Sequence, residues 1–201
     1  MTSESPLLLR LPFTGRWFVG QAGDTPNVNH HMKVRPQWYG VDFLKVGGDS
    51  GRTLVRTTGG SVEDFYSWDE PILAPADGEI VSALDGLPDC VLGQKDPANP
   101  AGNHVVIKSA PDRFIFVAHL KKGSVAVASG ERVKAGQVLG RCGNSGNSTA
   151  PHIHLHVQDG PVLNQGRGQR TIFQGIQVEL SGKRFENVDW PLLSGLFVWP
   201  A

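Results

Sequence analysis

The chain has 201 residues and a mass of 21.7 kDa, the size of one domain or of one domain with an appendage. Hydrophobic residues make up 39% of it and charged residues 19%, which provides enough apolar material for a core and too little charge for a disordered chain. Basic and acidic residues both number 19, so the formal net charge is zero and no global electrostatic field favours nucleic acid or an anionic membrane as partner.

The pattern of the chain predicts a mostly β fold with few helices. No window of a dozen residues keeps apolar side chains at helical spacing, whereas short runs rich in Val, Ile and Phe recur between turns made of Gly, Pro, Asp and Asn. This spacing indicates an antiparallel β sandwich or barrel rather than an alternating α/β chain. In chain order, strands are predicted at Glu79–Ala83, His104–Lys108, Phe114–Ala118, Gln137–Gly140, Ile153–Val157 and Thr171–Leu180.

The expected organisation is a single domain over residues 1–201, with a core at about 27–161 and a C-terminal β cap at about 162–201. A hairpin is predicted over Thr171–Arg184, and the long loop Leu84–Gly102 is expected to border a cleft. No apolar run approaches the roughly 20 residues of a membrane span, and the start of the chain as written has no recognisable export signal. Cys90 and Cys142 fit no metal or redox spacing; two buried free thiols are expected, with a disulfide as the alternative.

The segment that is most informative about chemistry is PHIHLHV, which contains His152, His154 and His156. In a strand, alternate side chains point to the same face, so these imidazoles would form a row at roughly 7 Å intervals while the apolar residues between them face the core. A row of histidines is typical of a metal site. Neutral imidazole binds zinc, and a catalytic zinc ion keeps three protein ligands and one open position, so a further ligand must come from elsewhere.

Candidates for that ligand occur earlier in the chain. Asp42 is a carboxylate in an apolar, strand-like run and would be costly to bury without a cation or hydrogen-bond donors; a solvated strand residue is the alternative. His30 and His31 are either ligands or a pair of turn histidines. His119 ends an apolar strand, where a polar side chain also occurs for purely structural reasons, and a structural or surface role is expected for His104.

Six segments of the chain resemble, in order and spacing, those of the lysostaphin/LytM-type zinc metallopeptidases. They are YGVDF, APADGEIV, GNHVVIK, FVAHL, VKAGQVLG and GNSGNSTAPHIHLH, and the resemblance covers about residues 27–161. It implies a mostly antiparallel β fold, the duplicated hybrid motif, with one zinc ion at the floor of a substrate groove.

The resemblance implies that Asp42 and His154 are zinc ligands and that His119 and His152 are catalytic. Many members have a further ligand histidine where this chain has Trp38. A sub-branch places that ligand upstream, in an N-x-H segment. Asn29-His30-His31 matches this segment, with His31 as the ligand and His30 as the rival. His156 departs from the many relatives that have a glutamate or another residue beside that strand position, and it is expected to support a ligand or line the groove rather than bind the metal.

The resulting hypothesis is a zinc endopeptidase in which a zinc-activated water attacks a peptide carbonyl. His119 and His152 would hydrogen-bond the water or the tetrahedral oxyanion, and one of them would pass a proton to the leaving amine. The resemblance implies that the substrate is a cross-link or stem peptide of peptidoglycan and that the compartment is extracytoplasmic. Two alternatives are a catalytically silent relative that binds peptide or protein in the same groove and a metal-free sugar-transport phosphocarrier with a related β fold.

Overall fold

The computed structural model describes residues 5–201, and in this part of the chain there are β-strands and short 3-10 helices but no α-helix. All six predicted strands are present, each end within two residues of its predicted position. The strands are β1 (Leu7–Leu9), β2 (Trp17–Gln21), β3 (Val41–Lys45), β4 (Pro71–Leu73), β5 (Gly78–Leu84), β6 (Asn103–Ala110), β7 (Arg113–Leu120), β8 (Arg132–Val133), β9 (Val138–Arg141), β10 (Ile153–Gln158), β11 (Thr171–Leu180), β12 (Lys183–Trp190) and β13 (Phe197–Pro200). The 3-10 helices are η1 (His30–Lys33), η2 (Arg35–Gln37) and η3 (Val62–Asp64).

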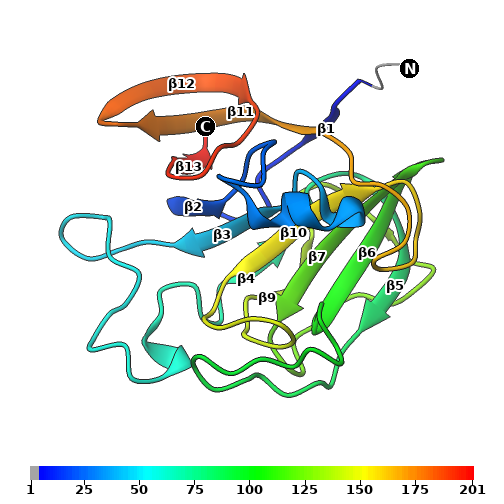
Figure 1. Cartoon of the computed structure of the whole chain (residues 1–201), viewed down its shortest axis with the longest axis horizontal. Helices are drawn as coiled ribbons and strands as arrows, with labels where there is room; N and C mark the ends of the chain where they lie inside the picture. Colours follow the sequence, from blue (N-terminus) through cyan, green and yellow to red (C-terminus); the bar gives the residue numbers. More distant parts are fainter. Residues whose placement is uncertain (1–4) are drawn as a thin grey trace.

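Most of the strands form one large sheet (Figure 1), in the order β1-β11-β13-β2-β3-β10-β7-β6-β5-β8, with β12 paired to β11. Strands β4 and β9 form a separate two-stranded sheet. The pair β1–β11 is parallel, and the other pairs between these strands are antiparallel. The expectation of a mostly β, largely antiparallel fold is therefore confirmed.

The first and last strands of the described residues lie in this same sheet. β11 and β12 form the predicted hairpin, whose turn at Ser181 and Gly182 has a positive φ at both residues. β13 pairs with β11 on one side and with β2 on the other, so the C-terminal strands continue the sheet that holds β3 and β10. How the chain divides into domains stays a prediction. Between residues 5 and 201, no helix is long and apolar enough to cross a membrane.

The core lies against the apolar face of β10. Ile153, Leu155 and Val157 are at most 1% exposed and belong to a buried cluster that also contains Phe43 and Val117 from the two neighbouring strands. Burying each of these side chains contributes roughly 1.5–3 kcal/mol. The predicted alternation is confirmed, because the histidines of β10 occupy the opposite face of the strand.

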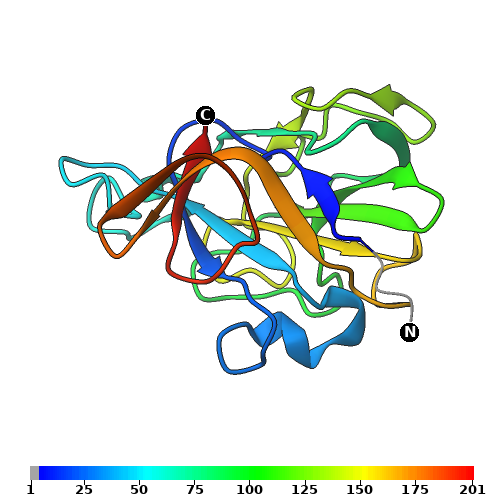
Figure 2. The same ribbon diagram turned by 90° about the horizontal axis from the view of Figure 1, so that it is seen from above.

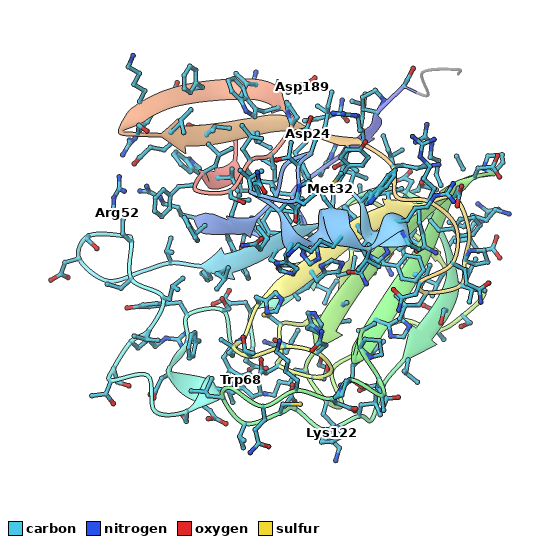
Figure 3. The ribbon with its side chains drawn as sticks, viewed as in Figure 1. Asp24, Met32, Arg52, Trp68, Lys122 and Asp189 are labelled. Carbon is cyan, nitrogen blue, oxygen red and sulfur yellow. The ribbon has the colours of Figure 1, made fainter. Side chains whose placement is uncertain are left out.

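The helical turns η1 and η2 lie beside β3 and β10, outside the sheet (Figure 2). Met32, labelled in Figure 3, marks the position of η1, and its sulfur accepts a hydrogen bond from the backbone N–H of Tyr39. Cys90 and Cys142 are free thiols; Cys142 is buried as expected, whereas Cys90 is partly exposed.

Candidate active site

Strand register brings Asp42 and His154 together. In the antiparallel pair β3–β10, His154 lies directly opposite Asp42, and its Nδ1 is 2.9 Å from the carboxylate Oδ1. Both residues are buried, at 6% and 7% exposure. They line a cleft of about 360 Å³, which His31, His119 and His152 also line.

His31 reaches the same carboxylate from η1. Asn29 explains its placement: the Asn29 Oδ1 accepts from the backbone N–H of His31 at 3.1 Å, and the Asn29 Nδ2 donates to the carbonyl of Gly40 at 3.0 Å. An asparagine two residues before the histidine therefore caps the turn and ties it to the start of β3. The His31 Nε2 lies 3.0 Å from the Asp42 Oδ1.

That short distance is not a hydrogen bond. His31 Nε2 is buried and has no hydrogen-bond partner among the described residues, although it lies next to a carboxylate oxygen. Leaving a buried polar nitrogen unpaired is costly, and the cost disappears if a cation sits beside it. His31 Nε2, Asp42 Oδ1 and His154 Nδ1 supply two imidazole nitrogens and one carboxylate oxygen, a ligand set that suits zinc with an open position. The residues present therefore fit a metal ion.

His30 is the rival for this role. Ligand atoms of His30, His31 and Asp42 lie within 4.8 Å of one another, and the His30 ring lies against that of His31 at a centroid distance of 4.0 Å. Unlike His31, His30 is exposed, so water can satisfy its nitrogens without a cation. Trp38, where many members of the resembled family have their histidine, does not line the cleft; the guanidinium of Arg167 lies over its ring.

Burial sets the charge states in this cluster. It is the largest influence on Asp42 and by itself would raise the carboxyl pKa, but His152, His154 and His31 together hold that pKa well below its ordinary value. Burial, with His31 nearby, lowers the pKa of His154 to about 3. At neutral pH the site thus holds an ionised carboxylate beside a neutral imidazole, the protonation states that a metal requires.

His119 and His152 stand next to the three candidate ligands, with their rings 4.7 Å apart between centroids. The Nδ1 of His119 lies 2.8 Å from the carbonyl of Ser145, and that of His152 lies 2.8 Å from the carbonyl of Ala150. A carbonyl can only accept, so each Nδ1 carries a proton, and in the neutral form of either ring the lone pair is on Nε2. Burial holds the pKa of His119 well below its ordinary value.

The backbone at His119 is also unusual. Its φ is +65°, in the left-handed region that non-glycine residues rarely adopt. Two hydrogen bonds hold it there, one from its N–H to the carbonyl of Ala101 and one from the N–H of Gly143 to its own carbonyl. Strain of this kind costs about 1–3 kcal/mol and is concentrated at functional sites.

The polar face of β10 continues past the candidate metal site. His156 Nδ1 lies 2.9 Å from His154 Nε2, and His156 Nε2 lies 3.2 Å from Gln158 Oε1. The His156 contact agrees with the expectation that it supports a ligand. Gln158 was not singled out by the sequence reasoning; the signal that could have found it is the period of two along the strand, which puts it on the histidine face.

The loop Leu84–Gly102 forms a wall of the cleft, as predicted, through Lys95, Pro100 and Ala101. Backbone hydrogen bonds from Cys90, Gly93 and Asp96 to residues 144–149 hold it beside the start of β10. His104 is not among the lining residues, and its Nδ1 lies 2.8 Å from the carbonyl of Gly102, in line with the structural role expected for it.

Residues 64–167, just over half of the chain, match the model of peptidase family M23, and the chain belongs to this family. The match includes His119, His152 and His154, whereas His31 and Asp42 precede it. The family expected from the sequence segments is confirmed.

Two curated relatives illustrate the similarity. The chain is 35% identical over 141 residues to the glycyl-glycine endopeptidase ALE-1 of Staphylococcus capitis, an alignment covering 70% of this chain and 34% of that protein. It is 30% identical over 115 residues to the peptidoglycan DD-endopeptidase ShyC of Vibrio cholerae, covering 57% and 24% respectively. The chain thus spans about a third of the length of the first relative and about a quarter of the second.

Among solved structures, the catalytic domain of the antimicrobial peptidase lysostaphin from Staphylococcus simulans is similar with a TM-score of 0.46 and 23% identity. That alignment covers 76% of this chain and 86% of the other.

Proposed function

We propose that this chain is a zinc-dependent endopeptidase that hydrolyses peptide bonds in peptidoglycan, with one zinc ion held by His31, Asp42 and His154. The observation that carries the proposal is the meeting of three ligand atoms from residues that line one cleft: His31 Nε2 and His154 Nδ1 lie 3.0 and 2.9 Å from Asp42 Oδ1. Membership of peptidase family M23 supports the reaction type.

The names of the two relatives support a substrate in the bacterial cell wall. One is a glycyl-glycine endopeptidase and the other a peptidoglycan DD-endopeptidase, so glycine-containing bridges and stem-peptide cross-links are the two substrate types to compare. The zero net charge of the chain agrees with recognition through the cleft itself rather than through attraction to a polyanion.

When bound, zinc would polarise the scissile carbonyl and make water nucleophilic near neutral pH. The histidines beside it would then handle the protons. His119 and His152 each hold a proton on Nδ1 against a backbone carbonyl, so their Nε2 atoms can accept a proton from the attacking water. Once protonated, the same Nε2 atom can donate to the tetrahedral oxyanion or to the leaving amine.

The test is cleavage of pentaglycine and of purified peptidoglycan peptides, with products identified by mass spectrometry. The native chain is expected to cleave at least one substrate type, and His154→Ala to lower the rate by at least about 10³-fold because an open zinc site needs all three protein ligands. His104→Ala is the matched control, since this histidine lies outside the cleft lining. Equal cleavage by the native and His154→Ala proteins would remove His154 from the chemistry. A native chain that binds zinc and cleaves neither substrate would instead be a silent peptide-binding relative.

A further inference from the structure

A row of buried polar groups runs from the candidate metal site along β10. Its contacts are Asp42 Oδ1 to His154 Nδ1 at 2.9 Å, His154 Nε2 to His156 Nδ1 at 2.9 Å, and His156 Nε2 to Gln158 Oε1 at 3.2 Å. All four side chains belong to buried residues, with exposures from 7% at Asp42 to 0% at Gln158. Because these side chains are at most 7% exposed, each contact between two of their polar atoms requires a hydrogen or a cation between them.

The far end of the row has a defined direction. The amide nitrogen of Gln158 donates to the carbonyls of Gly160 and Val162, at 2.8 and 2.7 Å. Carbonyl oxygens only accept, so this amide cannot be turned around without placing its own oxygen against two others. Its Oε1 must therefore face His156, and Gln158 ends the row as an acceptor, as the Asp42 carboxylate does at the other end.

The protons in the row can be counted. Three contacts each require a hydrogen or a cation, but two neutral imidazoles carry only one N–H apiece. If the N–H of His156 Nε2 points at Gln158, then His156 Nδ1 must accept from His154 Nε2. The contact left without a proton is the one between His154 Nδ1 and Asp42 Oδ1, where a lone pair faces a carboxylate oxygen. The unpartnered Nε2 of His31 lies beside the same oxygen.

We infer that Gln158 is a positioning residue for the metal site. Its oxygen fixes a proton on His156 Nε2, which makes His156 Nδ1 an acceptor and places the proton of His154 on Nε2. His154 then presents the lone pair of Nδ1 beside Asp42. The inference rests on the proposed metal-binding role of the site and adds a residue outside the ligand set. The reverse arrangement, with a proton on His154 Nδ1, would set the lone pair of His156 Nε2 against the oxygen of Gln158 and is disfavoured. The Phe116 ring, stacked on His156 at 4.7 Å and 10°, holds that imidazole in the plane the row requires.

Two substitutions at one position separate this role from simple anchoring of the segment that contains Gly160 and Val162. Gln158→Met keeps the length of the side chain but removes the oxygen that accepts from His156. Gln158→Glu keeps an oxygen facing His156 while disturbing the donation to the two carbonyls. The zinc dissociation constant of the full chain, measured by competition with a chelator, is expected to rise about 10–100-fold in Gln158→Met and to stay within about fivefold in Gln158→Glu.

Gln137→Met is the control for introducing a methionine, because Gln137 is exposed and does not line the cleft. Thermal unfolding of each variant shows whether it is folded, and long-range ¹H–¹⁵N spectra of the zinc-loaded native chain report which ring nitrogens carry protons. An N–H at Nε2 of both His154 and His156 is expected. An N–H at Nδ1 of His156, or zinc affinity unchanged in Gln158→Met, would overturn the inference.

An equal loss of affinity in both variants would overturn it as well, because that result assigns Gln158 an anchoring role only. If the native chain binds zinc and Gln158→Met weakens it, but no peptide is cleaved, the positioning role stands and the proposed function fails. If the native chain binds no zinc, both are wrong.

Discussion

The neighbouring histidines His30 and His31 provide a matched pair of substitutions that tests the metal site. His31→Ala removes a buried nitrogen that lies 3.0 Å from Asp42 Oδ1, whereas His30→Ala removes an exposed ring that lies against His31. Apparent zinc binding energies of about 10–16 kcal/mol over four ligands amount to about 3 kcal/mol per ligand. We therefore expect His31→Ala to weaken zinc binding about 100-fold, at 1.4 kcal/mol for each factor of ten.

His30→Ala should reduce the zinc affinity much less than His31→Ala. Loss of a ring contact at an exposed position is worth about 0.5–1 kcal/mol, which corresponds to at most about a fivefold change in affinity. The assay is zinc dissociation constants by chelator competition, with the metal content of the purified proteins as a second measurement. If His30→Ala loses zinc while His31→Ala retains it, the ligand is His30 and the assignment of the site is wrong. Urea unfolding of both variants without metal checks that any loss of affinity is not a loss of fold.

His152→Ala is expected to retain zinc within about fivefold while kcat falls about 10²–10⁴-fold, because the proposed role of this imidazole is proton transfer; loss of the metal would make it a ligand instead. Gly40→Ala should lower zinc affinity about tenfold, since the added Cβ would lie 3.0 Å from His154 Cε1 and 3.3 Å from His31 Cγ and would push the rings apart. An unchanged zinc affinity in the same competition assay would mean that the His31 and His154 rings can shift without weakening metal binding. The metal-free chain should lose stability as the pH falls from 7 toward 4. Unfolded histidines take up protons near 6.5, whereas burial lowers the folded pKa of His154 to about 3 and that of His156 to about 4. Each of these two contributes up to about 1.4 kcal/mol per pH unit below 6.5, and urea midpoints that do not move over this range would contradict the reasoning.

The strands and their two faces could be predicted because they depend on local pattern. Ile153, Leu155 and Val157 alternate with histidines, and a strand has only two faces, so the apolar face had to be buried. The N-x-H segment was supplied by the family resemblance, and the structure gives its local reason, since Asn29 caps the turn that carries His31.

The pairing of Asp42 with His154 could not be derived from periodicity or spacing, because it is decided by the register between strands that are far apart in the sequence. The resemblance to known peptidases supplied it instead. The proposal of His31 over His30 likewise depends on burial, which separates two adjacent residues of the same type only once the chain is folded.

By itself the sequence determined the β architecture, the alternation of β10 and the family, because each rests on residue order within short segments. The tertiary structure alone decided which nitrogen atoms face the Asp42 carboxylate and which way the Gln158 amide faces His156. Those features depend on hydrogen bonds whose direction is imposed by distant backbone carbonyls, and no local pattern encodes where such carbonyls will lie.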